Sequence, residues 1–358
     1  MPAYKDEKTN TWYCKFYYEN AQGEKKQKLK RGFTLQREAK DWERNFLETR
    51  SLDINVKFKN FVQQYYEDIE TRLRKSTVAN KKLLINSKIV PYFGDMVLSE
   101  IKPVHVRQWQ NSLLSYQDMN GKPYSQTYLK TINNQLSAIF NYAVRYYDLK
   151  ENPCVKAGSM GKKNADEMQI WTLQEFQQFI AADESIESYT AFNILYFTGI
   201  RVGELLALTW KDIDFNAKTI RINKSLQRIH REDVITKPKT PKSNRTIVIF
   251  DYLLDIIAAY KKSIYKPHVN DRLFMFTKFY LRNEMVRISS RAGVKKIRIH
   301  DLRHSHASLL IELNFSPLLI AERLGHEKIE TTLNTYSHLY PNKQNTLAET
   351  LQKILVSK

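Results

Sequence analysis

Two arginines, two histidines and one tyrosine in the last part of the chain could together act on a phosphodiester. They lie in four short motifs, at Arg201, at His300 with Arg303, at His326 and at Tyr336. Guanidinium groups bind phosphate well, and a neighbouring imidazole can share its protons. Because these motifs include no cluster of carboxylates, the chemistry that fits is metal-free phosphoryl transfer to a protein nucleophile, not two-metal catalysis.

In this scheme the nucleophile is the phenol of Tyr336. A tyrosine with the usual pKa of about 10 is ionised in only about one molecule in a thousand at neutral pH. Positive charge near the phosphate and a neighbouring histidine would favour the phenolate, and the arginines would neutralise the transition state. The leaving 5′-oxygen needs a proton donor, and a lysine on a hairpin could reach it. Residues 237–245 offer Lys237, Lys239 and Lys242.

Other interpretations of the same residues remain open at this stage. Taken singly, an arginine at the start of a helix or one tyrosine among 21 is an ordinary surface or packed residue. His300 and His304 have a zinc-compatible i,i+4 spacing, but no glutamate follows the first histidine as in His-Glu-x-x-His. Asp212 and Asp214 form a close acidic pair in an expected hairpin, where solvated charges are common.

Helix signals place each motif at the end or on the face of a helix. Gly199 ends one helix and Arg201 begins the next. The segment Ile299–Leu310, if helical, presents His300 and Arg303 on one face. Ser316 and Pro317 then begin a further helix, Gly325 ends it, and His326 follows that stop directly.

The rest of the chain predicts further domains. Residues 11–18 and 25–32 alternate as strands, and a helical stripe follows the plausible N-cap Thr34. Such a basic sheet with a helix behind it fits a DNA groove reader or a small docked domain equally well. Residues 55–150 predict helices only, residues 151–168 a linker, and residues 212–250 strands.

Charge and composition narrow the function classes. The chain of 358 residues has a net charge of +19, spread as +4 over residues 1–52, +8 over 53–165 and +7 over 166–358. That spread is expected if the whole chain lies along a polyanion, although a basic protein need not bind one. Cys14 and Cys154 lie far apart, which excludes a disulfide scaffold and a cysteine zinc site. Without a long apolar run or a signal-peptide core, we expect a cytoplasmic protein.

In the order and spacing of these motifs, the sequence resembles the tyrosine recombinases of the phage-integrase type. The order is Arg, a hairpin lysine, His-x-x-Arg, Leu-Gly-His and then Tyr, with Tyr336 ten residues after His326. The resemblance implies that Arg201 and Arg303 bind the scissile phosphate and that Tyr336 forms a 3′-phosphotyrosine, releasing a 5′-hydroxyl. It also implies proton transfer by His300 and a hydrogen bond from His326 to the phosphate.

The resemblance further implies roles for three other residues. The family's Lys-Thr pattern points to Lys239 as the general acid, with Lys237 and Lys242 close by. Glu204 and Asp301 match acidic positions that support the catalytic groups. Neither a cofactor nor a metal is implied.

The resemblance extends to nearly the whole chain and implies a multidomain fold. Residues 1–52 would form a small α+β arm-type DNA-binding domain with a three-stranded sheet and a helix. Residues 53–152 would form an all-α, SAM-like core-binding domain, 153–168 a linker, and 169–358 a mixed, mainly helical α+β catalytic domain with a C-terminal tail from residue 337.

The expected partner is double-stranded DNA at core and arm-type sites, bound by a homotetramer in the bacterial nucleoid, with an excisionase and a DNA-bending host protein as further candidates. The expected function is site-specific integration and excision of a mobile element. Two alternatives are a type IB-like topoisomerase and a catalytically inactive, sequence-specific DNA-binding regulator. An arm-type domain argues against the first, and the complete residue set against the second.

Overall fold

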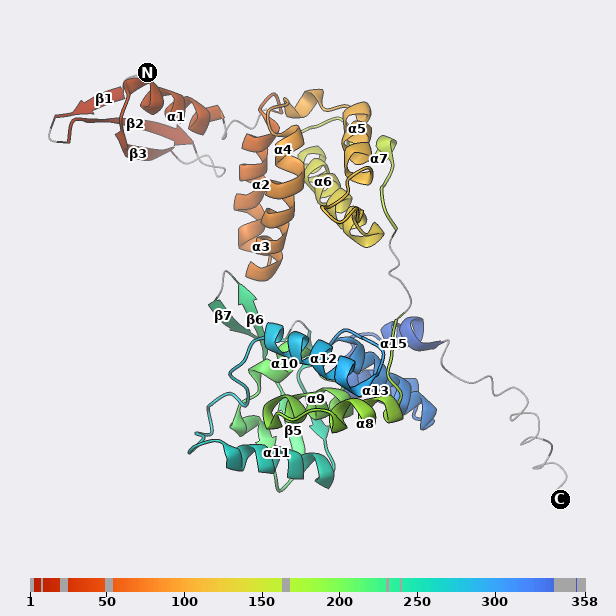
Figure 1. Ribbon diagram of the computed structural model, residues 1–358. Helices are drawn as coiled ribbons and strands as arrows, with labels where there is room; N and C mark the ends of the chain where they lie inside the picture. The colour runs from red at the N-terminus through yellow and green to blue at the C-terminus, as the bar shows by residue number, and fades with distance from the viewer. Residues whose placement is uncertain are drawn as a thin grey trace. The chain divides into compact units, whose positions relative to one another are not determined.

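The computed structural model describes residues 3–7, 9–19, 25–48, 54–162, 168–229, 232–238, 240–337 and 352. Its contacts divide the chain into two compact units, residues 1–166 and 167–358, and each is described by itself. The first unit holds two separate hydrophobic clusters, one in a small sheet-and-helix part and one in a helical part. The expected multidomain class, with a small α+β part, an all-α part and a mixed catalytic part, is confirmed (Figure 1).

The N-terminal part is an antiparallel sheet in the order β1-β2-β3 with one helix behind it (Figure 1). Its elements are β1 (Ala3–Asp6), β2 (Thr11–Glu19), β3 (Lys25–Phe33) and α1 (Gln36–Glu48). Cys14 and Phe16 of β2 are buried with Ala39 of α1, as the alternation of apolar residues predicts. Thr34 was expected to cap α1 with its side chain. Instead, the Glu38 carboxylate caps this end by accepting hydrogen bonds from Thr34 and Leu35.

The second part of this unit is all helical. Its elements are α2 (Phe58–Arg72), α3 (Lys75–Leu84), the π-helix η1 (Ile85–Ile89), α4 (Val90–Phe93), the 3₁₀ turn η2 (Leu98–Glu100), α5 (Pro103–Leu114), α6 (Gln126–Tyr146) and α7 (Pro153–Ala157). Ser125 caps α6 by accepting from the Tyr128 N–H, as predicted. Pro91 lacks the N–H that would bond four residues back, and the helix widens into the π turn just before it.

Residues 153–160 differ from the linker expected at 153–168. Pro153 begins α7, and the side chain of Asn152 caps that helix. Cys154 and Met160 are buried in the hydrophobic cluster of the helical part. Residues 153–157 have the composition of a loop but form a helix, because Cys154 within it and Met160 just after it are buried in this cluster. Cys14 and Cys154 are both free and buried, and burial raises the pKa of each thiol.

The second unit has a helical body and two small antiparallel sheets, in the order β4-β5-β8 and as the hairpin β6-β7. Its helices are α8 (Leu173–Ala181), α9 (Ile186–Thr198), α10 (Val202–Ala207), α11 (Asp251–Ser263), α12 (Lys278–Ala292), α13 (Asp301–Glu312), α14 (Pro317–Leu324) and α15 (Ile329–Tyr336), with the 3₁₀ turns η3 (Trp210–Asp212) and η4 (Pro241–Ser243). Its strands are β4 (Ile213–Asp214), β5 (Thr219–Ile222), β6 (Ser225–Ile229), β7 (Glu232–Thr236) and β8 (Arg245–Val248).

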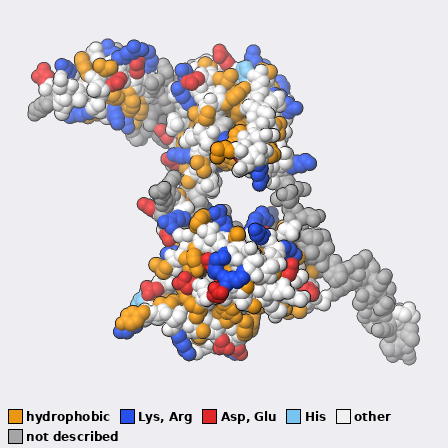
Figure 2. All heavy atoms as spheres, viewed as in Figure 1, with side chains coloured by type: hydrophobic (Ala, Val, Ile, Leu, Met, Phe, Trp, Pro, Cys, Tyr) orange, Lys and Arg blue, Asp and Glu red, His pale blue; other side chains and the backbone are white. Residues whose placement is uncertain are grey.

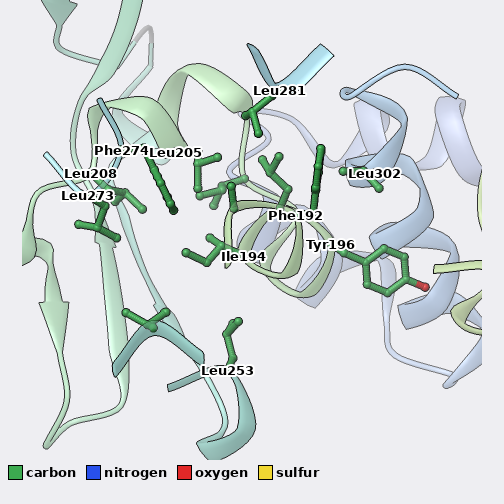
Figure 3. Packing of buried hydrophobic residues seen from close by; sticks show 14 of the residues in the cluster. Phe192, Ile194, Tyr196, Leu205, Leu208, Leu253, Leu273, Phe274, Leu281 and Leu302 are labelled. Atoms are coloured by element: carbon green, nitrogen blue, oxygen red, sulfur yellow. The ribbon is translucent and has the colours of Figure 1, made fainter. Parts of the chain in front are cut away.

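Helix α9 runs through the centre of the second unit. It buries side chains on every face, and Figure 3 shows Phe192, Ile194 and Tyr196 pointing in different directions from it. Neighbouring helices and strands supply the apolar residues that surround it. A helix enclosed in this way has little freedom to shift, so its C-terminal end is a rigid support for side chains placed there.

Lysine and arginine side chains are visible on the surface of every part of the molecule in Figure 2, interspersed with fewer acidic ones. This agrees with the even distribution of positive charge along the sequence. Among the helices that the structure describes, none combines the length and the apolar character needed to cross a bilayer.

Candidate active site

Arg303 is held by the ends of two helices. Its Nη1 donates to the carbonyl of Gly199 at the end of α9, and its Nη2 to the carbonyl of Leu324 at the end of α14, both at 2.8 Å. Helix C-terminal carbonyls carry partial negative charge and hold a cation without neutralising it. The side chain is only 3% exposed. Burial and the Arg201 charge lower the pKa of Arg303 to about 9, which leaves the group charged at neutral pH.

Gly199 and Gly325 end these two helices in the left-handed conformation, as their positions in the sequence predict. A Cβ on Gly199 would stand 2.6 Å from Leu324 Cδ2 and 2.7 Å from His306 Cδ2. Glycine is therefore required there for space as well as for its φ of +64°. The close approach brings the two carbonyls that bind Arg303 to the same place.

Arg201, Glu204 and Arg245 form one ion-pair network beside this point. Arg201 is the N-cap of α10, and its backbone N–H and its Nη1 both donate to Glu204, at 3.0 and 2.9 Å. From β8, Arg245 donates through Nη2 to the same carboxylate at 3.0 Å. Burial raises the pKa of Glu204, but the charges and hydrogen bonds of the two arginines outweigh it and keep the pKa below its usual value.

Arg245 also connects this network to the His326 turn. Its Nε donates to the carbonyl of Arg323 at 2.8 Å. Its Nη1 packs so close to Gly325 that a Cβ added there would stand only 2.9 Å from it. His326 follows Gly325, and its Nδ1 lies 2.8 Å from Thr332 Oγ1. Burial, followed by the charges of Arg303 and Arg201, lowers the pKa of His326 to about 4. The imidazole is therefore neutral at neutral pH.

His300 immediately precedes α13, and Arg303 lies in the first turn of that helix. Although His300 keeps an exposed surface, desolvation of its ring and the charges of His304 and Arg303 lower its pKa to about 4. The next residue, Asp301, is buried and accepts hydrogen bonds from the backbone N–H and the guanidinium of Arg298. Asp301 thus fixes the start of α13 and belongs to the support of the site.

The phenol of Tyr336 is enclosed at the end of α15. Its side chain is 1% exposed and packs with Ala307, Ile311, Ile320 and Leu324. Its hydroxyl lies 2.7 Å from Nδ1 of His304 on α13. Burial raises the pKa of Tyr336 to about 12, against the lowering effect of the Arg303 charge.

The β6–β7 hairpin packs directly against the start of α10. At Gly203 an added Cβ would meet Ser225 Oγ at 2.7 Å and the Leu226 carbonyl at 2.9 Å. The general acid expected at Lys239 lies outside the described residues. Lys237 and Lys242, its two alternatives, are both exposed on either side of that position.

The acidic pair expected to be solvated is partly buried. Asp212 is 6% exposed, accepts from Thr209 and forms an ion pair with Lys224. Burial raises its pKa, but hydrogen bonds from Lys224 and Thr209 lower it more. Asp214 accepts from the backbone of Asn216 and Ala217 and so forms the turn before β5. Within the described residues, no group of three or more histidines, cysteines and acids could hold a metal ion.

Three residues of the predicted set, Arg201, Arg303 and His326, lie at the ends of α9 and α14. Arg303 binds the carbonyls at the ends of α9 and α14, Arg201 follows α9, and His326 follows α14. Arg201, Arg303 and His326 are also coupled by their charges. Three residues of the site were not predicted: Arg245, His304 as the partner of Tyr336, and Arg323, which donates to the buried His306. Their sequence positions carry no signal for these contacts, since each joins segments far apart in the chain.

Comparison with known families matches three stretches of the chain. A profile of the phage integrase family matches residues 169–343. A profile of the N-terminal SAM-like domain of phage integrases matches residues 57–114, and one of an arm DNA-binding domain matches residues 2–49.

Curated relatives match over most of their length. The ICEBs1 integrase of Bacillus subtilis is 31% identical over 321 residues, which cover 84% of each chain. The integrase of Staphylococcus phage L54a is 28% identical over 313 residues, covering 73% of this chain and 86% of its own.

Solved structures share the fold. The Tn1549 transposon integrase, in complex with a circular intermediate DNA, superposes with a TM-score of 0.66 at 21% identity, covering 82% of this chain and 99% of that one. A lambda integrase tetramer bound to a Holliday junction gives a TM-score of 0.58 at 18% identity, covering 92% and 96%.

Proposed function

The chain belongs to the phage integrase family of tyrosine recombinases, and on that premise we propose which of its residues break and rejoin DNA. It is a site-specific recombinase that acts through a phosphotyrosine intermediate, in the integration and excision of a mobile element. Tyr336 is the proposed nucleophile, and Arg201, Arg303, His300 and His326 are the proposed phosphate-binding and proton-transferring groups.

One observation carries this assignment: two guanidinium groups share a single buried carboxylate, and the charge of a third, Arg303, is coupled to both Arg201 and that carboxylate. Arg201 and Arg245 share Glu204, while Arg303 is bound by uncharged carbonyls. The net positive charge of this group suits the doubly charged oxygens of a pentacoordinate phosphate. The scissile phosphate would bind beside Arg201, whose side chain is 39% exposed, and the charge of the buried Arg303 would add to its attraction.

Proton transfer is assigned to two histidines and one lysine. His300 and His326 have pKa values near 4 and are neutral before DNA binds. A bound phosphate would raise both values, because an anion favours the imidazolium form. A lysine that follows β7 in the sequence, Lys239 by the family pattern, would protonate the leaving 5′-oxygen. A phosphotyrosine bond retains the energy of the broken phosphodiester, so neither ATP nor a metal is required.

The first unit is assigned to DNA binding. Residues 1–52 would bind arm-type sites and residues 53–152 core sites, and the catalytic domain would begin near residue 169. The active assembly is proposed to be a homotetramer on paired DNA sites, associated with the nucleoid. An excisionase and a DNA-bending host protein are proposed to direct the reaction.

The test is a nicked suicide substrate that traps the covalent intermediate. Wild-type chain should give a slowly migrating protein–DNA band, and Tyr336→Phe should give none while binding the same DNA. Tyr252→Phe, which changes an exposed tyrosine of α11, is the matched control and should behave like the wild type. A band that survives Tyr336→Phe contradicts the nucleophile assignment.

The suicide substrate and a relaxation assay on supercoiled DNA together separate the two alternative functions. A catalytically inactive regulator would bind the DNA and give no band with wild-type chain. A type IB-like topoisomerase would relax supercoiled DNA without attachment sites and would not join two DNA molecules.

A further inference from the structure

The Tyr336 hydroxyl is bound by a residue outside the proposed catalytic set. It lies 2.7 Å from Nδ1 of His304, and the ring centroids of the two residues are 5.7 Å apart. The tyrosine ring is otherwise enclosed by the apolar side chains of α13 and α14. Among the described residues, His304 is the one hydrogen-bond partner of this hydroxyl. The position of the phenol oxygen therefore depends on a single directional contact.

The direction of this hydrogen bond follows from the protonation states of the two groups. Burial lowers the pKa of His304, and the charges of Arg303 and Arg298 lower it further, while Asp301 raises it. From α15 the facing titratable group is Tyr336 itself, which is protonated at neutral pH because its pKa is about 12. The protonated phenol can donate to Nδ1 when the imidazole proton lies on Nε2, and we adopt this direction.

Helix α13 carries this contact on the same side as His300. His300 precedes the helix, Arg303 lies one turn along it, and His304 is the next residue. The rings of His300 and His304 stand nearly perpendicular, with centroids 5.1 Å apart. Because residues at i and i+4 are side by side on a helix, α13 holds the partner of the phenol oxygen beside His300.

We propose that His304 is a positioning residue for the nucleophile. Its Nδ1 holds the Tyr336 hydroxyl oxygen at the position from which that oxygen attacks the phosphate. The inference rests on the proposed function of Tyr336. His304 is not assigned to the phosphate or to the leaving group. Its role is to keep the oxygen of an enclosed ring at one point, because misplacement of a reacting atom by about 1 Å can cost about 100-fold in rate.

The experiment measures single-turnover covalent attachment to the suicide substrate at saturating protein. His304→Ala should lower the rate at least about tenfold with unchanged DNA affinity, which corresponds to loss of one buried hydrogen bond. His304→Asn should recover the rate to within about threefold of wild type, because its amide group stands where Nδ1 does. His268→Ala, at an exposed histidine of the same unit, should match the wild type.

A substrate with sulfur in place of the bridging 5′-oxygen separates His304 from the acid. A thiolate leaves without a proton donor, so this substrate should restore a Lys239→Ala variant and leave the His304→Ala defect in place. Restoration of His304→Ala by sulfur would overturn the proposal, as would an unchanged or faster rate with the normal substrate. A defect of equal size in a folded His304→Asn variant would also overturn it. If the wild-type chain forms no covalent band at all, the proposed function fails first.

Discussion

Replacing Glu204 by Gln should remove the charge on which two arginines of the site depend. Glu204 is 6% exposed and accepts from Arg201 at 2.9 and 3.0 Å and from Arg245 at 3.0 Å. Glutamine keeps the shape and one acceptor oxygen, so the change tests charge and not packing. The guanidinium of Arg245, itself only 7% exposed, would be left buried without a counter-charge.

The size of the effect follows from the burial of each pair. Breaking a buried ion pair by removing one partner costs about 3–5 kcal/mol of stability. Because glutamine keeps one acceptor oxygen, we expect Glu204→Gln to cost about 3 kcal/mol. Arg201 is 39% exposed, so its share is small, about 0.5 kcal/mol after solvent screening. In a unit of this size each kcal/mol lowers the melting temperature by about 2–4 °C, so we expect a fall of about 7–14 °C.

Thermal unfolding followed by circular dichroism measures this fall, and the suicide substrate measures the loss of covalent attachment. Glu322→Gln, at an exposed position of α14, is the matched control and should shift the melting temperature very little. If Glu204→Gln shifts it no more than this control, or attaches to DNA at the wild-type rate, the network does not support the site as argued.

Four other predictions follow from the same geometry. Gly199→Ala should destabilise the second unit by about 3 kcal/mol in a denaturant titration, because it strains a left-handed residue and crowds Leu324 and His306; a loss below about 1 kcal/mol would contradict the close approach. His306 is buried and accepts a hydrogen bond from Arg323, and its pKa is lowered to about 3. Because the unfolded chain then binds a proton that the folded chain does not, stability should fall as the pH drops from about 6.5 towards 3. His306→Gln should flatten this dependence in melting curves recorded across that pH range. Affinity for DNA should fall steeply with salt in a log–log plot, and a flat line would contradict an extended contact with the backbone. Covalent attachment to DNA should be equally fast with and without EDTA. Loss of attachment in EDTA would show that the reaction needs a metal ion.

Local signals in the sequence predicted the helix ends of the site well. Gly199, Gly325 and the Ser316–Pro317 start are determined by the conformations that these residue types favour, so their positions could be read without knowing the tertiary contacts. The N-terminal strands and the capped helix at Ser125 follow from alternation and capping for the same reason.

Contacts between distant segments could not be predicted in this way. Nothing in the sequence around Arg245 indicates that it shares Glu204 with Arg201, because that contact depends on β8 packing near α10. His304 was considered only for its spacing from His300, and its contact with Tyr336 requires α13 and α15 to meet. Residues 153–157 were assigned to a linker because five residues are too few to show a helical period.

The two backbone carbonyls that bind Arg303, at Gly199 and Leu324, determine which mutations the site tolerates. Every residue carries a carbonyl, so this anchor cannot be deleted by exchanging one side chain for another at position 324. It is lost if α9 or α14 stops at a different residue. The placement of this buried arginine is thus encoded in helix length, a property that point substitutions alter far less often than insertions or deletions.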